Sequence, residues 1–240
     1  MRISLAQIHP EKGDIDRNIE IHRRWIETAV EEKADLVAFS ELSLTGYEPE
    51  LADALGLAAN DERLTVFQEL SDRHSISIAL GLPLRTEAGL FISMAIFSPL
   101  QPVQTYTKQQ LHADEKPFFK EGNEQLLIEV GGQHVAPAIC YESLQESHAA
   151  HAHHLGASIY LASVAKNEAG IEKALKQYPK TAINYGMPVV MANCIGFCDN
   201  FLSVGQSAVW DEKGALVGQL KEDAEGLLTF DTETGEVTVR

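Results

Sequence analysis

The stretch Val135-Ala-Pro-Ala-Ile-Cys140-Tyr-Glu-Ser143 is a short apolar run that delivers one cysteine into a turn. The pattern predicts a strand, and the polar, alanine-rich segment 144–155 after it favours a helix. Backbone N–H groups converge at a strand-to-helix junction, and the helix dipole favours negative charge there. Such a place suits a thiolate nucleophile and the oxyanion that its attack creates. Most free cysteines are small buried hydrophobic residues, so the position alone leaves both interpretations open.

The composition indicates an ordered globular chain. We expect one domain over residues 1–240, a length that can bury a substantial core. The net charge of −16 argues against nonspecific nucleic-acid binding and against anionic membrane surfaces. No run approaches the ~18 apolar residues of a membrane span, and the N-terminal apolar run is short for a signal peptide. Cys140, Cys194 and Cys198 do not form a disulfide framework, so we expect a reducing, cytoplasmic location.

Strands and helices alternate along most of the chain. We expect strands at 2–8, 35–40, 76–82, 91–97, 103–107, 125–130, 134–139, 157–162 and 187–193, and helices at 16–32, 61–74, 144–155 and 168–185. The last segment, 205–240, is strand-like and is punctuated by turns at 212–214, 224–226 and 233–235. The order predicts a mixed α/β fold with two layers of sheet.

Three predicted strands end on or beside a chemically competent residue: Glu41, Lys108 and Cys140. Each has an ordinary explanation when taken alone, because a loop Glu or Lys is usually solvated. Together, a carboxylate, an ammonium and a thiol form a complete apparatus for cleaving a carbonyl–nitrogen bond. Cys140 would attack the carbon, Glu41 would take the thiol proton and return it to the leaving nitrogen, and Lys108 would stabilise the oxyanion. The backbone N–H of Tyr141 would be a second oxyanion donor.

The same residues lie in motifs that resemble the nitrilase, or carbon–nitrogen hydrolase, superfamily. The motifs are Phe39-Ser-Glu41-Leu-Ser-Leu-Thr-Gly46-Tyr47-Glu-Pro49, Tyr106-Thr-Lys108-Gln-Gln-Leu111, the set Glu115, Phe118, Phe119 and Gly122, Ala138-Ile-Cys140-Tyr-Glu142, and a late hairpin over 205–214. They occur in the order found in the superfamily and extend over essentially the whole chain.

The resemblance implies a four-layer α-β-β-α sandwich and a homodimer that pairs through the helices near Cys140. It carries Glu41, Lys108 and Cys140 over as the catalytic triad, with no cofactor and no metal. It also carries Glu115 over as a second carboxylate that holds Lys108 and helps to place the leaving amine.

The resemblance also suggests pocket residues, each with a plainer alternative. Tyr47, Phe119 and Tyr141 are candidates to line the pocket, or they pack in the core or the hairpin. The resemblance assigns no substrate to the segment 163–167, where Lys166 would bind a substrate carboxylate or is an ordinary surface lysine. The sequence departs from many amidase members after the cysteine motif, where Glu142 replaces an aspartate and Leu144 replaces an arginine.

Four histidines, His148, His151, His153 and His154, look at first like a metal cluster, because two pairs are one helical turn apart. No second segment completes such a site, and the superfamily uses no metal. We therefore expect no metal site. An alternative hypothesis is that these histidines lie at a dimer interface and make pairing pH-dependent.

The sequence therefore predicts a hydrolase that cleaves a non-peptide carbon–nitrogen bond of a small molecule, most simply an amide, through a thioester. Nitrile hydrolysis and acyl transfer to an amine are alternatives that use the same triad. A catalytically silent binding or scaffold protein is an alternative of another class. The triad argues against it, because a silent relative has no physical reason to keep a costly buried Glu–Lys pair beside a thiol.

Overall fold

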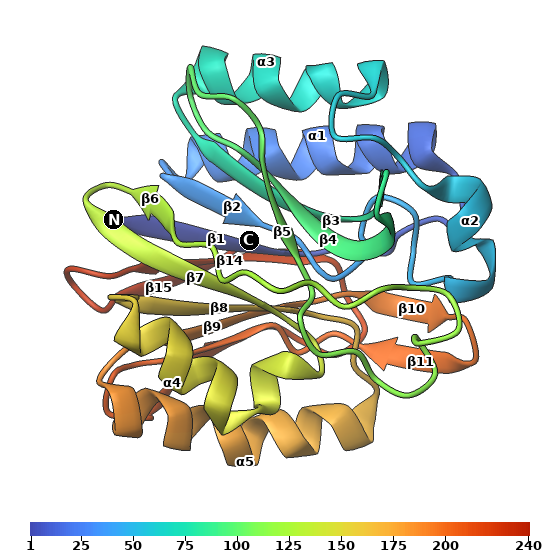
Figure 1. The fold of residues 1–240 in the computed structure, drawn as a ribbon. Helices are drawn as coiled ribbons and strands as arrows, with labels where there is room; N and C mark the ends of the chain where they lie inside the picture. Colours follow the sequence, from blue (N-terminus) through green and yellow to red (C-terminus); the bar gives the residue numbers. More distant parts are fainter.

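Two β-sheets pack face to face in the computed structural model, which describes residues 1–240, and helices cover the outer face of each sheet (Figure 1). The order of layers is helix, sheet, sheet, helix. The four-layer α-β-β-α sandwich expected from the sequence is therefore confirmed.

The first sheet has seven strands in the order β15-β14-β1-β2-β3-β4-β5. Their bounds are β1 Arg2–Gln7, β2 Leu36–Ala38, β3 Ser77–Thr86, β4 Gly89–Phe97, β5 Gln104–Thr107, β14 Gly226–Asp231 and β15 Val237–Val239. The central strands β1, β2 and β3 are parallel, and the outer pairs are antiparallel. The C-terminal strands thus complete the sheet that the N-terminal strand begins.

The second sheet has six strands in the order β13-β12-β9-β8-β7-β6. Their bounds are β6 Ile128–Val130, β7 Gln133–Ile139, β8 Ile159–Val164, β9 Val189–Asn193, β12 Ala208–Trp210 and β13 Leu216–Gln219. Its centre, β7, β8 and β9, is also parallel. The parallel strands are buried along most of their length, because they are covered on both faces.

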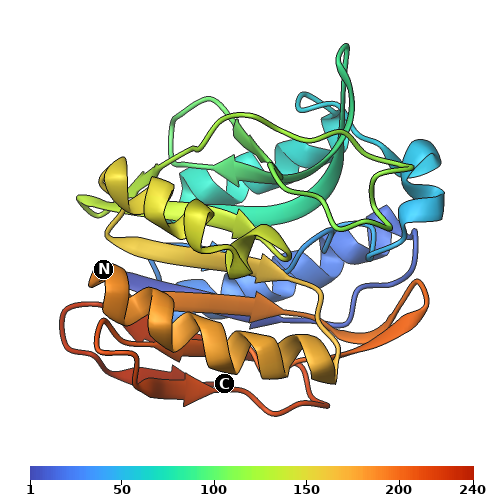
Figure 2. The same ribbon diagram turned by 60° about the horizontal axis from the view of Figure 1, so that its bottom comes forward.

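Two helices lie on each outer face. The helices α1 (Ile15–Glu31) and α3 (Thr65–His74) cover the first sheet, and α4 (Glu146–His154) and α5 (Glu168–Tyr185) lie side by side on the second (Figure 2). The core accordingly has three parts, one between the sheets and one under each helix pair. The short helix α2 (Ala52–Leu55) and three single turns of 3₁₀ helix, Pro49–Leu51, Glu62–Leu64 and Glu142–Leu144, complete the helical elements.

The structure contains one hairpin that the sequence did not predict. The strands β10 (Ile195–Cys198) and β11 (Phe201–Val204) form a separate two-stranded sheet. Cys194 precedes β10 and Cys198 ends it; both are buried and free, with their sulfur atoms 3.7 Å apart. The predicted helix at 144–155 begins two residues later, because a turn of 3₁₀ helix precedes it.

None of the helices combines the length and the apolar character that crossing a membrane requires.

Candidate active site

Four polar side chains follow strands from both sheets. Glu41 comes after β2, Lys108 directly after β5, Cys140 directly after β7, and Lys166 shortly after β8. Because β2 belongs to the parallel centre of one sheet and β7 and β8 to that of the other, their carboxyl ends meet at one end of the sandwich. Ligands bind at this end of parallel strands in many α/β folds.

Close packing of backbone sets the turn that carries Glu41. A Cβ atom on Gly81 would lie 2.6 Å from the carbonyl oxygen of Ser40 and 2.9 Å from the carbonyl carbon of Glu41, and it would also meet the backbone nitrogen of Leu42. Only glycine leaves space for this turn to cross β3. A similar contact beside Lys108 brings Gly122 against the carbonyl oxygen of Thr107.

Lys108 lies between two carboxylates. Its Nζ donates to Oε1 of Glu41 at 2.7 Å and to Oε1 of Glu115 at 2.6 Å, and all three side chains are buried. Tyr47 also donates to Oε1 of Glu115, at 2.8 Å. The structure thus brings Glu41, Lys108 and Glu115 together, as expected, and it places Tyr47 against Glu115, a contact that was not predicted.

Burial and charge act against each other in this cluster. Burial raises the pKa of Glu41 to about 7, because the Lys108 ammonium offsets desolvation only in part and Glu115 adds to the rise. Burial also opposes the charge of Lys108, but the two carboxylates outweigh it and raise the lysine pKa above its ordinary value. Lys108 therefore stays a cation, while Glu41 can exchange a proton near neutral pH. The second oxygen of Glu41, Oε2, is buried and accepts no hydrogen bond.

Cys140 occupies a strained turn. Its φ angle is +46°, a left-handed conformation that is uncommon outside glycine, and its N–H donates to the carbonyl oxygen of Ser163 at 3.0 Å. The Sγ atom lies 3.7 Å from the carbonyl oxygen of Ala165 and 3.8 Å from Nζ of Lys166. The N–H of the next residue, Tyr141, takes part in none of the hydrogen bonds of the turn. That N–H is consequently free to bind an oxyanion.

The thiol of Cys140 is neutral in the resting site. Burial and the nearby Glu41 carboxylate raise its pKa to about 11, although the ammonium groups of Lys166 and Lys108 act in the opposite direction. A neutral thiol needs a base to become a nucleophile. The Glu41 carboxylate, whose charge acts directly on the thiol, is the acidic group suited to that task.

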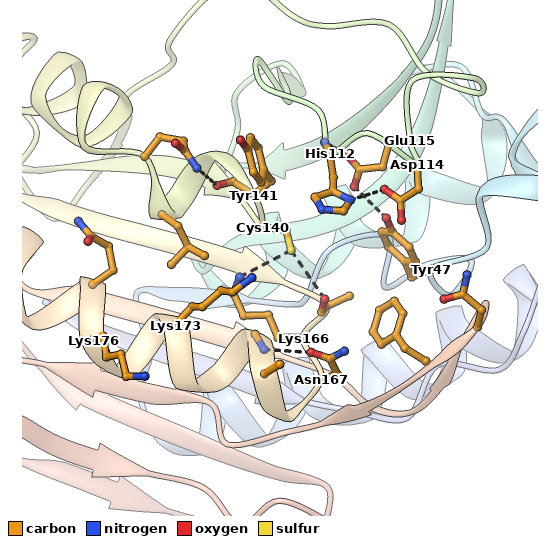
Figure 3. A pocket seen from close by; sticks show the side chains of 18 residues that line it. Tyr47, His112, Asp114, Glu115, Cys140, Tyr141, Lys166, Asn167, Lys173 and Lys176 are labelled. Atoms are coloured by element: carbon orange, nitrogen blue, oxygen red, sulfur yellow. Dashed lines mark hydrogen bonds and ion pairs between the residues drawn. The ribbon is translucent and has the colours of Figure 1, made fainter.

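Cys140 opens into a cavity of about 710 Å³ (Figure 3). Its wall comes from several segments: Tyr47, His112, Asp114, Glu115, Cys140, Tyr141, Leu144, Gln145, Ala165, Lys166, Asn167, Ala169, Gly170, Lys173, Lys176, Gln177, Asn200 and Phe201. The hairpin that the sequence did not predict supplies Asn200 and Phe201, and the ring of Phe201 lies 5.6 Å from that of Tyr47. A cavity of this size fits a small molecule.

Two candidate pocket residues have different outcomes. Phe119 is 4% exposed in the core between the sheets and does not line the cavity, which corrects its assignment as a pocket residue. Its aromatic ring fills core space in the segment that follows Lys108. Lys166 is not a surface lysine. It is 5% exposed and lines the cavity beside Cys140.

Glu142 has a role that the sequence did not indicate. Its carboxylate is buried and accepts hydrogen bonds from the N–H groups of Ile139, Gln109 and Gln110 and from the hydroxyl of Tyr106. The bonds join the turn of Cys140 to the loop of Lys108. Such a carboxylate is a positioning group, because it touches both loops and does not line the cavity.

The four histidines of α4 do not act as a unit. His148 is buried between the hydroxyl groups of Tyr106 and Tyr160, and its burial lowers its pKa to about 4. His151, His153 and His154 are exposed, so the hypothesis of a pH-dependent interface stays a prediction for these three. No group of three or more His, Cys, Asp or Glu side chains is placed to hold a metal ion.

Comparisons with known proteins indicate the family of the chain. The model of the carbon–nitrogen hydrolase family matches residues 2–238. The chain is 25% identical over 246 residues to the glutamine-dependent NAD(+) synthetase of Thermotoga maritima, a match that covers 98% of this chain and 42% of that protein. It is 26% identical over 110 residues to the omega-amidase YafV of Escherichia coli, covering 45% of this chain and 42% of that protein. The chain spans less than half the length of the synthetases that it matches.

Solved structures share the fold. The amidase NitN from Nesterenkonia sp. AN1 superposes with a TM-score of 0.86 at 24% identity, over 96% of this chain and 92% of that one. A CN-hydrolase superfamily protein from Xanthomonas campestris, which holds an arsenic adduct in its active site, gives a TM-score of 0.86 at 22% identity, over 95% of this chain and 89% of that one. At these identities the likeness establishes the fold alone.

Proposed function

Because the chain belongs to the carbon–nitrogen hydrolase family, we propose that it hydrolyses the amide bond of a small molecule through a thioester on Cys140. The observation that carries the proposal is the buried bridge from Lys108 to both Glu41 and Glu115 beside the cavity that Cys140 lines. Burying three charges is costly, and a protein that only bound a ligand would gain nothing from placing them next to a thiol.

The first half of the reaction forms the acyl-enzyme. The sulfur of Cys140 adds to the amide carbonyl carbon as its proton passes to Glu41. The Lys108 ammonium and the N–H of Tyr141 stabilise the tetrahedral oxyanion. The carbon–nitrogen bond then breaks as Glu41 gives the proton to the nitrogen, which leaves as ammonia or an amine.

The second half regenerates the thiol. Water adds to the thioester carbon as Glu41 takes its proton, and the same donors hold the second oxyanion. The carbon–sulfur bond breaks, the carboxylic acid leaves, and the sulfur recovers its proton from Glu41. Glu115 keeps Lys108 in place through both halves, since it binds the ammonium through a second hydrogen bond beside that to Glu41.

Intact-protein mass spectrometry tests the proposal. The protein is mixed with simple aliphatic amides, ω-amido acids, glutamine and nitriles, and ammonia release is measured in parallel. We expect an acyl adduct on the wild type that added hydroxylamine removes as a hydroxamate, which frees the thiol, and no adduct on Cys140→Ala. Folded protein that gives neither adduct nor ammonia across the panel would support the alternative of a silent binding protein.

The resemblance also predicts that two chains pair through the helices near Cys140. We keep a homodimer as a proposal, and sedimentation velocity at neutral pH tests it. A single species at the monomer mass across the accessible concentration range would contradict it.

A further inference from the structure

Lys166 is a buried cation without a carboxylate partner. Its side chain is 5% exposed, and its Nζ lies 3.8 Å from the sulfur of Cys140. The ion pairs of the structure include two for Lys108 and none for Lys166. An ammonium that is largely covered by protein is stabilised when an anion pairs with it. The pairing anion is therefore expected to come from outside the protein.

The backbone of Lys166 is fixed in place before any ligand arrives. Its N–H donates to Oδ1 of Asn193 at 2.9 Å. Its carbonyl oxygen accepts from Oγ of Ser203 at 3.1 Å, from the N–H of Val204 at 3.1 Å and from Nδ2 of Asn193 at 3.2 Å. Four hydrogen bonds from two other segments thus fix the backbone from which the side chain of Lys166 extends toward Cys140.

The surface around Lys166 is cationic as well. Lys173 and Lys176 of α5 line the same wall of the cavity, and in Figure 3 they extend from Lys166 away from the side that holds Tyr47 and Glu115. Asn167 caps the N-terminus of α5, where the helix dipole is positive. Three lysines thus line one wall of the cavity, although the chain as a whole has 19 Lys and Arg against 35 Asp and Glu.

The carboxylates that line the cavity do not neutralise this wall. Glu115 is bound to Lys108, and Asp114 lies 2.5 Å from the ring of His112 on the opposite side. The cavity therefore offers a neutral to acidic side near Tyr47 and a basic side near Lys166.

We propose that the substrate is an amide whose acyl chain carries a carboxylate, and that Lys166 binds that carboxylate. The inference rests on the proposed function, whose substrate class it narrows. A carboxylate oxygen about 2.8 Å from Nζ of Lys166 lies at most about 6.6 Å from the sulfur of Cys140. This reach suits a short chain, as in succinamate, and Lys173 and Lys176 draw the anion toward the cavity.

A second role for Lys166, stabilising the thiolate of Cys140, would produce a different pattern. A cation that acts on the sulfur serves every amide equally, whereas a cation that binds the acyl chain serves only substrates that carry the anion. Comparing a charged substrate with a neutral one of similar length separates the two roles.

The test compares ammonia release from succinamate and from its methyl ester. We expect the wild type to prefer succinamate, and Lys166→Met to lower the ratio of the two kcat/KM values about 10- to 100-fold, the worth of one charged hydrogen bond. Lys166→Arg should restore part of the ratio, because it keeps the charge. Lys180→Met, which removes an exposed lysine of α5 outside the cavity, should leave the ratio unchanged.

Equal loss on both substrates in Lys166→Met would overturn the inference, and so would a wild type that prefers the ester. Calorimetric binding to Cys140→Ala separates this result from failure of the proposed function, because it needs no turnover. The inference is supported if Cys140→Ala binds succinamate more tightly than the ester and if the double variant Cys140→Ala, Lys166→Met loses this preference. This support would hold even if no amide were hydrolysed. Failure of Cys140→Ala to bind succinamate would overturn it, even with Cys140-dependent hydrolysis of neutral amides.

Discussion

Glu142 accepts a hydrogen bond from the backbone N–H of Gln109 at 2.6 Å, which ties the loop after Lys108 to the turn that carries Cys140. The two residues are 33 positions apart, and they belong to loops that follow strands of different sheets. The same carboxylate oxygen also accepts from the N–H of Gln110, at 3.1 Å. The distance between the proposed nucleophile and the proposed oxyanion cation is thus set by a group that touches neither substrate nor solvent.

We predict that Glu142→Gln lowers both activity and stability. The amide has nearly the same shape, but its NH₂ group replaces one of the two acceptor oxygens and leaves N–H groups without a partner. The free energy of unfolding should fall by about 2–4 kcal/mol, and kcat should fall about 10- to 100-fold through misplacement of Lys108. Urea unfolding and ammonia release measure the two effects.

Glu146→Gln is the matched control for Glu142→Gln, because Glu146 is exposed in the first turn of α4. It should change neither quantity measurably. A Glu142→Gln protein with wild-type kcat would show that the two loops keep their separation without this carboxylate.

A second prediction concerns Gly81. Gly81→Ala places a methyl group into the backbone of the Glu41 turn, with 2.6 Å to the carbonyl oxygen of Ser40. The turn must move, so we expect activity to fall about 100-fold and the protein to lose about 1–3 kcal/mol of stability. In Gly132→Ala the added methyl group meets nothing within 4 Å, although φ there is +74°. This control should cost about 1 kcal/mol from backbone strain and leave kcat unchanged.

The sequence predicted that Glu41, Lys108 and Cys140 lie at strand ends because each comes after a recognisable strand. Glu41 and Cys140 end apolar runs, and Lys108 ends an alternating one, so the strand pattern alone places them at strand ends. The contact between Lys108 and Glu115 was expected from the family resemblance, and the distances confirm that the two side chains meet. The local sequence pattern is therefore sufficient to locate a residue whose position is set by the end of a strand.

The parts that the sequence did not predict depend on long-range packing. Burial of Lys166 follows from hydrogen bonds to Asn193 and Ser203, which belong to segments 27 and 37 positions away. The hairpin over 195–204 contains Gly196 with φ +95° and Phe197 exposed at 80%, so it lacks the alternation of a half-buried strand. Phe119 was misassigned because an aromatic residue near a site has the same sequence signature in a pocket wall as in the core.

A third prediction follows from the raised pKa of Glu41. The carboxylate form is the base, so protonation below the pKa of about 7 should remove activity. We expect kcat/KM to fall about tenfold per pH unit below that value. In Glu41→Gln this acidic limb should disappear, and kcat/KM should be about 10²- to 10⁴-fold lower at neutral pH. Ammonia release between pH 5.5 and 9 provides both profiles.

Glu50→Gln is the control for the pH profile, because Glu50 is exposed and outside the cavity. It should keep the acidic limb of the wild type. Retention of the limb in Glu41→Gln would assign the titration to another group and would contradict the role of Glu41 as base.

The last prediction concerns stability below neutral pH. His22 is fully buried, with Nδ1 2.6 Å from the carbonyl oxygen of Asn18 and Nε2 2.9 Å from Oγ of Ser43, and burial lowers its pKa from 6.5 to about 4. Below pH 6.5 the unfolded chain therefore binds a proton that the folded chain does not, so the free energy of unfolding falls as the pH falls. Between pH 7.5 and 5.5 this residue should account for about 1 kcal/mol of that loss.

The variant His22→Gln removes the titrating group. The fall in its free energy of unfolding between the two pH values should therefore be smaller than that of the wild type by this amount, whatever its stability at pH 7.5. His151→Gln, at an exposed position, should lose as much as the wild type. Urea unfolding at the two pH values measures all three proteins, and an identical loss in His22→Gln and the wild type would refute the assignment to His22.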